Sequence, residues 1–350
     1  LEGSTMTNYL LRLVRVTVVA CSIFVFGFSI TSFSQQSCPR IMVQDSSLNN
    51  LVDPVGYKTG TLGELGRVDK MGTGRQAMIL IPGMGMGGGV FKDFMEANKD
   101  KYTMYAVTLP GIDGTPAPPL PPESVSFGQT PWTNGAFTAI EKLIENEKIE
   151  RPILVGNWMT GTQLALRLAL KYPDKIKAVI IPSGYACMVM TDTSVYKPHP
   201  PLETRIAGID KYMIPRWFKT VTRDTWDDNN YMPHDYAVNP IMGLRIWREA
   251  AEPALHVWVR YLNEFYCQDI AQQLDSLTVP TLLLYPGLEG LYSDPNQNYM
   301  YASCHTSWAS SAPNHKLITS VTIPNSRICM WIDQPEKFND EMSKFLAGVK

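Results

Sequence analysis

The chain has 350 residues, of which 45% are hydrophobic and 18% are charged, with 25 Gly and 26 Pro. This composition is typical of a globular protein and excludes a collagen-like, coiled-coil or fully disordered chain. The 31 basic and 33 acidic residues give a formal net charge of −2, and no basic stripe is present, so we expect no nucleic-acid partner. At roughly 150 residues per domain, the length allows two domains or one large domain with an insertion.

The N-terminus has the features of a secretory signal. After an expected tag remnant over residues 1–5, Arg12 and Arg15 precede an apolar run over residues 16–33. A charged start, an apolar stretch and then a small residue, Ser34, match a signal peptide. The prediction is a secreted or periplasmic protein with no stable membrane span after cleavage. An uncleaved anchor is the alternative, because the run is close to the ~18 residues that begin to span a bilayer.

Signal cleavage would leave an odd number of cysteines. They are Cys38, Cys187, Cys267, Cys304 and Cys329. At least one thiol then stays unpaired in a monomer, and Cys304 and Cys329 are candidates for a disulfide whose geometry the spacing does not fix. We expect the cysteines to be structural or inert. No Cys-x-x-Cys or His/Cys cluster at metal spacing occurs, so no metal and no cofactor are expected.

From Gln76 onward, short apolar runs alternate with longer helical patterns, which predicts parallel strands joined by crossover helices. The expected fold class is α/β, with a mostly parallel central sheet covered by helices on both faces. The expected strands are 76–81, 102–109, 153–155, 176–181, 281–285 and 317–323. The expected helices are 90–98, 134–146, 160–172, 295–309 and 335–346.

Residues 184–268 break this alternation and are rich in Trp, Tyr, Pro and His. We interpret them as a lid or cap inserted over the carboxyl ends of the strands, where open α/β sheets build their sites. The core would then comprise residues 35–183 and 269–350, after the tag remnant and signal peptide at 1–34. The aromatic residues have a simpler alternative role as the lid's own core.

The segment Leu154–Gly161, followed by an Ala/Leu-rich helix, resembles the nucleophile elbow of the α/β-hydrolase family. Other segments follow in that family's order. They are Ile79–Gly83 (strand and oxyanion-hole turn), Leu109–Gly111 (next strand end), Val279–Gly287 (strand before the catalytic acid) and Ile323–Pro335 (histidine loop and start of the last helix). Residues 76–347 therefore resemble lid-containing, esterase- or lipase-like members, which implies the α/β-hydrolase fold.

The same resemblance puts a substitution at each position of the family's Ser-His-acid triad. The nucleophile position falls on Trp158, whose indole cannot attack a carbonyl, the acid position on Gly290 and the histidine position on Ile328. Thr160 replaces the second elbow glycine. A tryptophan in the elbow's backbone conformation is strained by about 1–3 kcal/mol, so we expect either a relaxed elbow or an indole held by packing.

Nearby residues are weaker substitutes for the triad. Glu289 is the carboxylate nearest the acid position, and Thr160, Ser183 and Cys187 are alternative nucleophiles. Each nucleophile needs a base within hydrogen-bond reach.

Two of the five histidines are expected too far from the carboxyl edge of the sheet to act as the base. His315 precedes a strand that is roughly 23 Å long at about 3.3 Å per residue, and His305 lies about 15 Å along its predicted helix at about 1.5 Å per residue. Only His199, His234 and His256, in the predicted lid, are expected to reach the pocket.

Part of the family's apparatus is expected to survive. The resemblance places the oxyanion-hole amides at Met84 and Met159. Around them, Gly83, Met84, Met86, Trp158 and Met159 are expected to line an apolar site for a hydrophobic small molecule. The alternative is that Trp158 fills the vacated cavity.

The resulting interpretation is a secreted α/β-hydrolase-like pseudoenzyme that binds hydrophobic small molecules or serves as a scaffold. Loss of even one triad member typically costs about 10⁴ to 10⁶ in rate, and three independent losses favour inactivity. The alternative hypothesis is an esterase-like hydrolase with a rearranged active site.

Overall fold

The computed structural model describes residues 58–186, 201–287, 304–305, 307–309, 312 and 314–350. The chain divides into two units, 1–44 and 45–350, and every described residue belongs to the second. The predicted tag remnant, signal peptide and most of the predicted helix at 295–309 lie outside the described residues. Within the described ranges, no helix combines the length and hydropathy that a membrane span requires.

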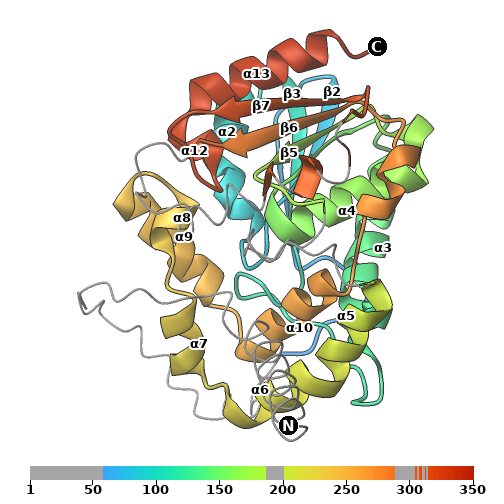
Figure 1. Cartoon of the computed structure of the whole chain (residues 1–350). Helices are drawn as coiled ribbons and strands as arrows, with labels where there is room; N and C mark the ends of the chain where they lie inside the picture. The colour runs from blue at the N-terminus through green and yellow to red at the C-terminus, as the bar shows by residue number, and fades with distance from the viewer. Residues whose placement is uncertain (1–57, 187–200, 288–303, 306, 310–311, 313) are drawn as a thin grey trace, which may run out of the picture. The chain divides into compact units, whose positions relative to one another are not determined.

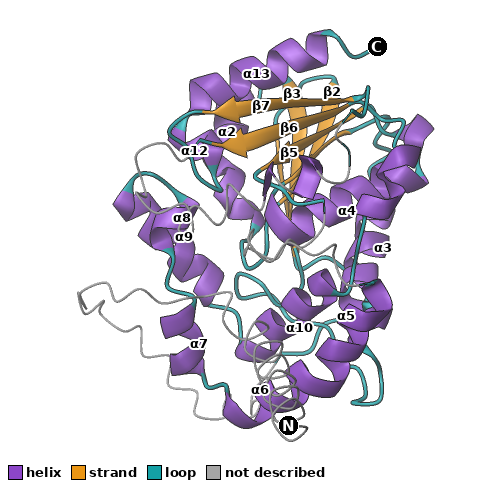
Figure 2. Ribbon diagram, in the orientation of Figure 1, coloured by secondary structure: helices purple, strands orange, loops and turns teal. Residues whose placement is uncertain are grey.

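A seven-stranded sheet runs through the described chain in the order β1-β3-β2-β4-β5-β6-β7 (Figures 1 and 2). Strands β2 to β7 are parallel, and β1 joins the edge antiparallel to β3. The bounds are β1 Arg67–Met71, β2 Gln76–Ile81, β3 Tyr102–Thr108, β4 Ile153–Gly156, β5 Ala178–Pro182, β6 Thr281–Pro286 and β7 Ile318–Ile323. The predicted α/β class with a mostly parallel sheet is confirmed.

Helices cover both faces of this sheet. α2 and α13 share one face, where Phe94 and Phe338 meet edge to face, and α3 and α4 share the other (Figure 1). The bounds are α2 Lys92–Asn98, α3 Pro131–Asn146, α4 Trp158–Lys171, α12 Met330–Asp333 and α13 Pro335–Ala347. Near-continuous apolar strands such as β2 and β6 are buried because both faces are covered.

The described residues between β5 and β6 form helices and no strand. This is where the sequence breaks its alternation, although the predicted bounds of the insertion, 184–268, stay a prediction. The helices are α5 Leu202–Gly208, a π-helical turn Ile209–Met213, α6 Ile214–Thr220, α7 Arg223–Asn229, α8 Pro233–Tyr236, α9 Pro240–Ala251 and α10 Leu255–Tyr266, followed by the 3-10 helix η7 Ala271–Ser276.

A buried carboxylate joins α10 to the core. Glu264 is fully buried and accepts hydrogen bonds from the amides of Trp132 and Thr133 at 3.2 and 2.7 Å. It also accepts from Thr133 Oγ1 at 2.8 Å and from Arg260 Nε at 2.7 Å. The carboxylate thus caps the first turn of α3, where amides lack intrahelical acceptors, and neutralises a buried guanidinium.

We therefore expect Glu264→Gln to lower the free energy of unfolding by about 3–5 kcal/mol, because it leaves Arg260 buried without its charge partner. The matched control is Glu96→Gln, since Glu96 pairs with Lys99 at 3.1 Å with both side chains about half exposed. Such an exposed pair is worth under about 1 kcal/mol. Urea unfolding of the two variants gives the comparison, and equal losses would contradict the anchoring role of Glu264.

Candidate functional site

The turn between β4 and α4 keeps the strained geometry of an elbow. Trp158 has φ 33° and Met159 has φ 39° and ψ −109°. Non-glycine residues in this region cost on the order of 1–3 kcal/mol each. The expected relaxation of the elbow is therefore wrong, and the reason lies in the two glycines that flank it.

Those glycines let α4 approach the sheet closely. A Cβ on Gly161 would lie 2.6 Å from the carbonyl oxygens of Ile81 and Pro82, at the end of β2. A Cβ on Gly156 would lie 2.5 Å from the Cβ of Ala165. No residue with a Cβ fits at either position without movement of its neighbours. The strand therefore lies close to the helix, and the turn is confined to the few residues between the two glycines.

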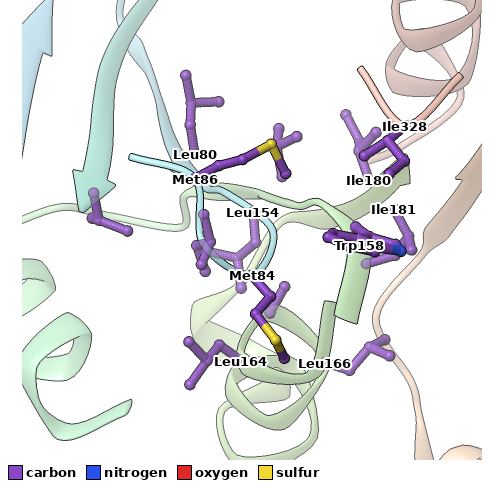
Figure 3. Packing of buried hydrophobic residues seen from close by; sticks show 14 of the residues in the cluster. Leu80, Met84, Met86, Leu154, Trp158, Leu164, Leu166, Ile180, Ile181 and Ile328 are labelled. Carbon is purple, nitrogen blue, oxygen red and sulfur yellow. The ribbon is translucent and has the colours of Figure 1, made fainter. Parts of the chain in front are cut away.

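Packing holds the indole of Trp158 in place, which was the alternative to a relaxed elbow. The side chain is 5% exposed, and Nε1 donates to the hydroxyl of Tyr185 at 3.1 Å. The ring also meets Tyr236 of α8 edge to face, with centroids 5.9 Å apart. Figure 3 shows the indole beside Ile181 and Ile328.

The predicted histidine position lies next to the predicted nucleophile position. Ile328 is fully buried, and its carbonyl accepts a hydrogen bond from Asn157 Nδ2 at 3.2 Å. Asn157, which precedes Trp158, donates from the same nitrogen to the carbonyl of Pro182 at 3.0 Å. The fold thus brings positions 158 and 328 together, with apolar side chains at both (Figure 3). Gly290 and Glu289, for the acid, lie outside the described residues.

The two described alternative nucleophiles, Thr160 and Ser183, are buried. Ser183 has φ 52°, and its Oγ donates to the carbonyl of Arg327 at 3.2 Å. Thr160 is 1% exposed, and its Oγ1 has no hydrogen-bond partner among the described residues. No hydrogen bond joins either hydroxyl to a histidine within the described ranges. Cys187 and His199 fall outside them.

His305 does not point away from the carboxyl edge of the sheet, so that expectation is wrong. Its ring stacks on Tyr285, near the end of β6, with centroids 4.1 Å apart. Its helical neighbours also contact this edge. Cys304 Sγ donates to the carbonyl of Ser183 and Trp308 Nε1 to that of Gly184, and both acceptors directly follow β5. Partial burial lowers the pKa of His305. A distance along a helix does not give the direction in which the helix runs.

The remaining described histidines lie in three different settings. His256 is buried in α10, and His234 of α8 is exposed beside Asp235, at 3.8 Å. His315 precedes β7 and accepts from the amide of Leu317 at 3.3 Å, at the amino end of that strand as expected.

The residues of the predicted apolar ligand site pack against one another. Met84 and Met86 are 2% and 1% exposed, whereas Met159 is half-buried. A Cβ on Gly83 would lie 2.6 Å from Met86 Cε and 3.0 Å from Trp158 Cβ. The amide of Met84 has no acceptor among the described residues. The side chains fill the space around this amide, and the ligand role stays a prediction.

Sequence reasoning missed the polar residues that hold this arrangement. Asn157 was detectable, because it directly follows the elbow's first glycine in the motif. Tyr185 and Tyr236 carried no such signal, since they come from the segment after β5 and from α8 and meet Trp158 only in the folded chain.

Cys304 and Cys329, the candidates for a disulfide, do not form one. Both thiols are free and buried, as is Cys267. Cys304 Sγ lies 3.2 Å from the carbonyl oxygen of Ser183, and Cys329 Sγ lies 3.8 Å from Met86 Sδ. Burial raises the pKa of Cys267 to about 12 and raises the pKa values of Cys304 and Cys329 as well.

Comparison with known proteins agrees with this fold. No family model matches the chain. Pimeloyl-[acyl-carrier protein] methyl ester esterase of Aeromonas hydrophila is 25% identical over 226 residues, 64% of this chain and 81% of that protein. Its namesake from Pectobacterium atrosepticum is 23% identical over 279 residues, 78% and 95% of the two chains. The solved esterase EaEST of Exiguobacterium antarcticum matches with a TM-score of 0.57 at 15% identity, over 80% and 95% of the chains.

The topology and these structural similarities show that the chain has the α/β-hydrolase fold. Its relatives in sequence and its neighbours in structure include proteins named as esterases.

We expect Gly161→Ala to destabilise the protein by about 1–3 kcal/mol or more, because the new methyl group overlaps the β2 carbonyls. Gly208→Ala is the matched control, since a Cβ there meets nothing within 4 Å. Within a helix that change is neutral or stabilises by up to about 1 kcal/mol. Thermal unfolding of both variants tests the close approach of α4 to β2. Equal unfolding temperatures for the two variants would refute it.

The buried thiols predict that stability falls as pH rises above about 8.5, the ordinary pKa of an unfolded cysteine. Between that pH and the raised folded pKa, the unfolded chain has lost the proton that the native thiol retains, so deprotonation favours unfolding. Each thiol contributes a slope of at most about 1.4 kcal/mol per pH unit. Urea unfolding from pH 7.5 to 10 under reducing conditions measures the slope, which should be shallower in Cys267→Ala. An unchanged slope in that variant would contradict the assignment.

Proposed function

We propose that this protein is a non-catalytic member of the α/β-hydrolase fold family, of esterase ancestry, that acts as a binding or scaffold protein. The observation that carries the proposal is the buried indole of Trp158 at the elbow, with Ile328 beside it in the predicted histidine position. A fold alone does not imply an activity, so the chemistry of these positions decides.

Ester hydrolysis by this family's route needs an activated oxygen and a base that takes its proton. Nε1 of Trp158 is committed as a donor to Tyr185 and offers no attacking lone pair. The side chain of Ile328 cannot accept a proton. Both deficits favour a protein that does not form an acyl-enzyme.

Packing favours the scaffold form of this proposal over the binding of a hydrophobic small molecule. Trp158, Met84 and Met86 are nearly fully buried, so a ligand at the elbow would have to displace the indole. The amides of Ile328 and Cys329 donate to the carbonyls of Asp235 and Tyr236 in α8. These contacts support the proposal that residues 184–268 form a lid. The proposed secreted or periplasmic location rests on the N-terminal sequence pattern alone.

An esterase with a rearranged site is the second candidate, and the names of the relatives favour it. It would use the amides of Met84 and Met159 as an oxyanion hole and Thr160 or Ser183 as nucleophile, with Glu289 and a lid histidine. Against it, the Ser183 hydroxyl is buried and already donates to a main-chain carbonyl.

The proposal predicts that the protein hydrolyses p-nitrophenyl butyrate no faster than a heat-inactivated sample. It also predicts no mass increase after incubation with a fluorophosphonate, because only an activated hydroxyl reacts stoichiometrically. An active serine esterase assayed in parallel is the positive control.

Turnover or a stoichiometric adduct would overturn the proposal and support the second candidate. Peptide mapping of the adduct, together with the variants Thr160→Ala and Ser183→Ala, would then identify the nucleophile.

A further inference from the structure

A surface cavity of about 450 Å³ lies away from the elbow, between α3, α4 and η7. Arg167 of α4 lines it, nine residues after Trp158 in the sequence, which is about 13 Å along the helix at about 1.5 Å per residue. Volumes of about 300–1,000 Å³ are usual for small-molecule sites.

One lining residue of this cavity is an aromatic ring that two cations of α4 cover. Phe137 of α3 is 7% exposed, and its centroid lies 4.7 Å from the guanidinium carbon of Arg167 and 5.0 Å from Lys171 Nζ. Both distances are within the range of cation–π attraction, which holds the two cations at the cavity wall.

The guanidinium of Arg167 makes no ion pair among the described residues. Nη2 donates to Asn134 Oδ1 at 2.7 Å and Nη1 donates to Gln268 Oε1 at 3.1 Å, and both acceptors are neutral amides. A guanidinium carries five N–H donors, so these two bonds orient the group and leave donors available. Burial lowers the pKa of Arg167, which reflects the cost of holding this charge away from water.

The two carboxylates that act on Arg167 through space pair with other cations, and one of them, Glu141, also lines the cavity beside its partner Lys171. Glu141 accepts from Lys171 Nζ at 2.6 Å and from the hydroxyl of Tyr172 at 2.5 Å. Glu264 caps α3 and pairs with Arg260. Arg167 is half-buried and makes no ion pair among the described residues, so an incoming anion would add charge-assisted hydrogen bonds to its guanidinium.

We propose that this cavity binds a small organic carboxylate with an apolar body. The carboxylate would accept hydrogen bonds from the remaining N–H groups of Arg167, in the two-pronged geometry that a guanidinium favours. The apolar body would lie against Leu170, beside the nearly buried Phe137, a contact that an inorganic anion could not make. This site is independent of the chemistry at the elbow and therefore of the proposed function.

Calorimetric titration of the full chain with sodium hexanoate tests the proposal, with hexanamide and inorganic phosphate as the other probes. We expect hexanoate to bind, and hexanamide and phosphate to bind at least tenfold more weakly. Arg167→Gln should weaken hexanoate binding at least tenfold, and Arg167→Lys, which keeps the charge but loses the fork, should weaken it less.

The matched control is Arg75→Gln, because Arg75 is exposed and the net charge changes equally. It should bind hexanoate as the unsubstituted protein does. The proposal is overturned if hexanoate does not bind at millimolar concentration, if hexanamide or phosphate binds as tightly, or if Arg167→Gln and Arg75→Gln are equivalent. Thermal unfolding of Arg167→Gln reports whether that variant is folded, and Arg167→Lys provides the same comparison if it is not.

Discussion

The close approach of α4 to the ends of β2 and β4 determines the geometry of the whole elbow. Gly156 and Gly161 have no space for a Cβ, so the residues between them must make the turn. Trp158 and Met159 accordingly adopt positive φ values that cost on the order of 1–3 kcal/mol each. Burial of a large apolar side chain stabilises the folded state by about 1.5–3 kcal/mol. The buried indole therefore offsets backbone strain of the same order.

The same comparison explains why apolar residues suit positions 158 and 328 once catalysis is not required. A hydroxyl or an imidazole buried at these positions would need hydrogen-bond partners, and an unpaired polar group costs about 1–3 kcal/mol. Ile328 needs none, and the single polar atom of Trp158 is satisfied by Tyr185. A site that would hold polar groups in an active enzyme is thereby continuous with the hydrophobic core.

Each predicted strand from Gln76 onward is present to within two residues, because buried parallel strands are continuous apolar runs. β1 was not predicted, since Arg67, Asp69 and Lys70 give an edge strand no such run. The elbow was detectable because close backbone approach requires glycine at fixed spacing. The partners of Trp158, the position of His305 and the pairing of Cys304 depended on how distant segments meet, which local sequence patterns do not encode.

The elbow and the Arg167 cavity lie on one helix but depend on different contacts. The elbow is held by β2, by β5 through Asn157, and by α8, whereas Arg167 is held by α3 and by Gln268, just after α10. α10 also supplies Glu264 to α3. The cavity itself is lined by α3, α4 and η7. The charge and lining of the cavity therefore do not depend on the side chains at the elbow.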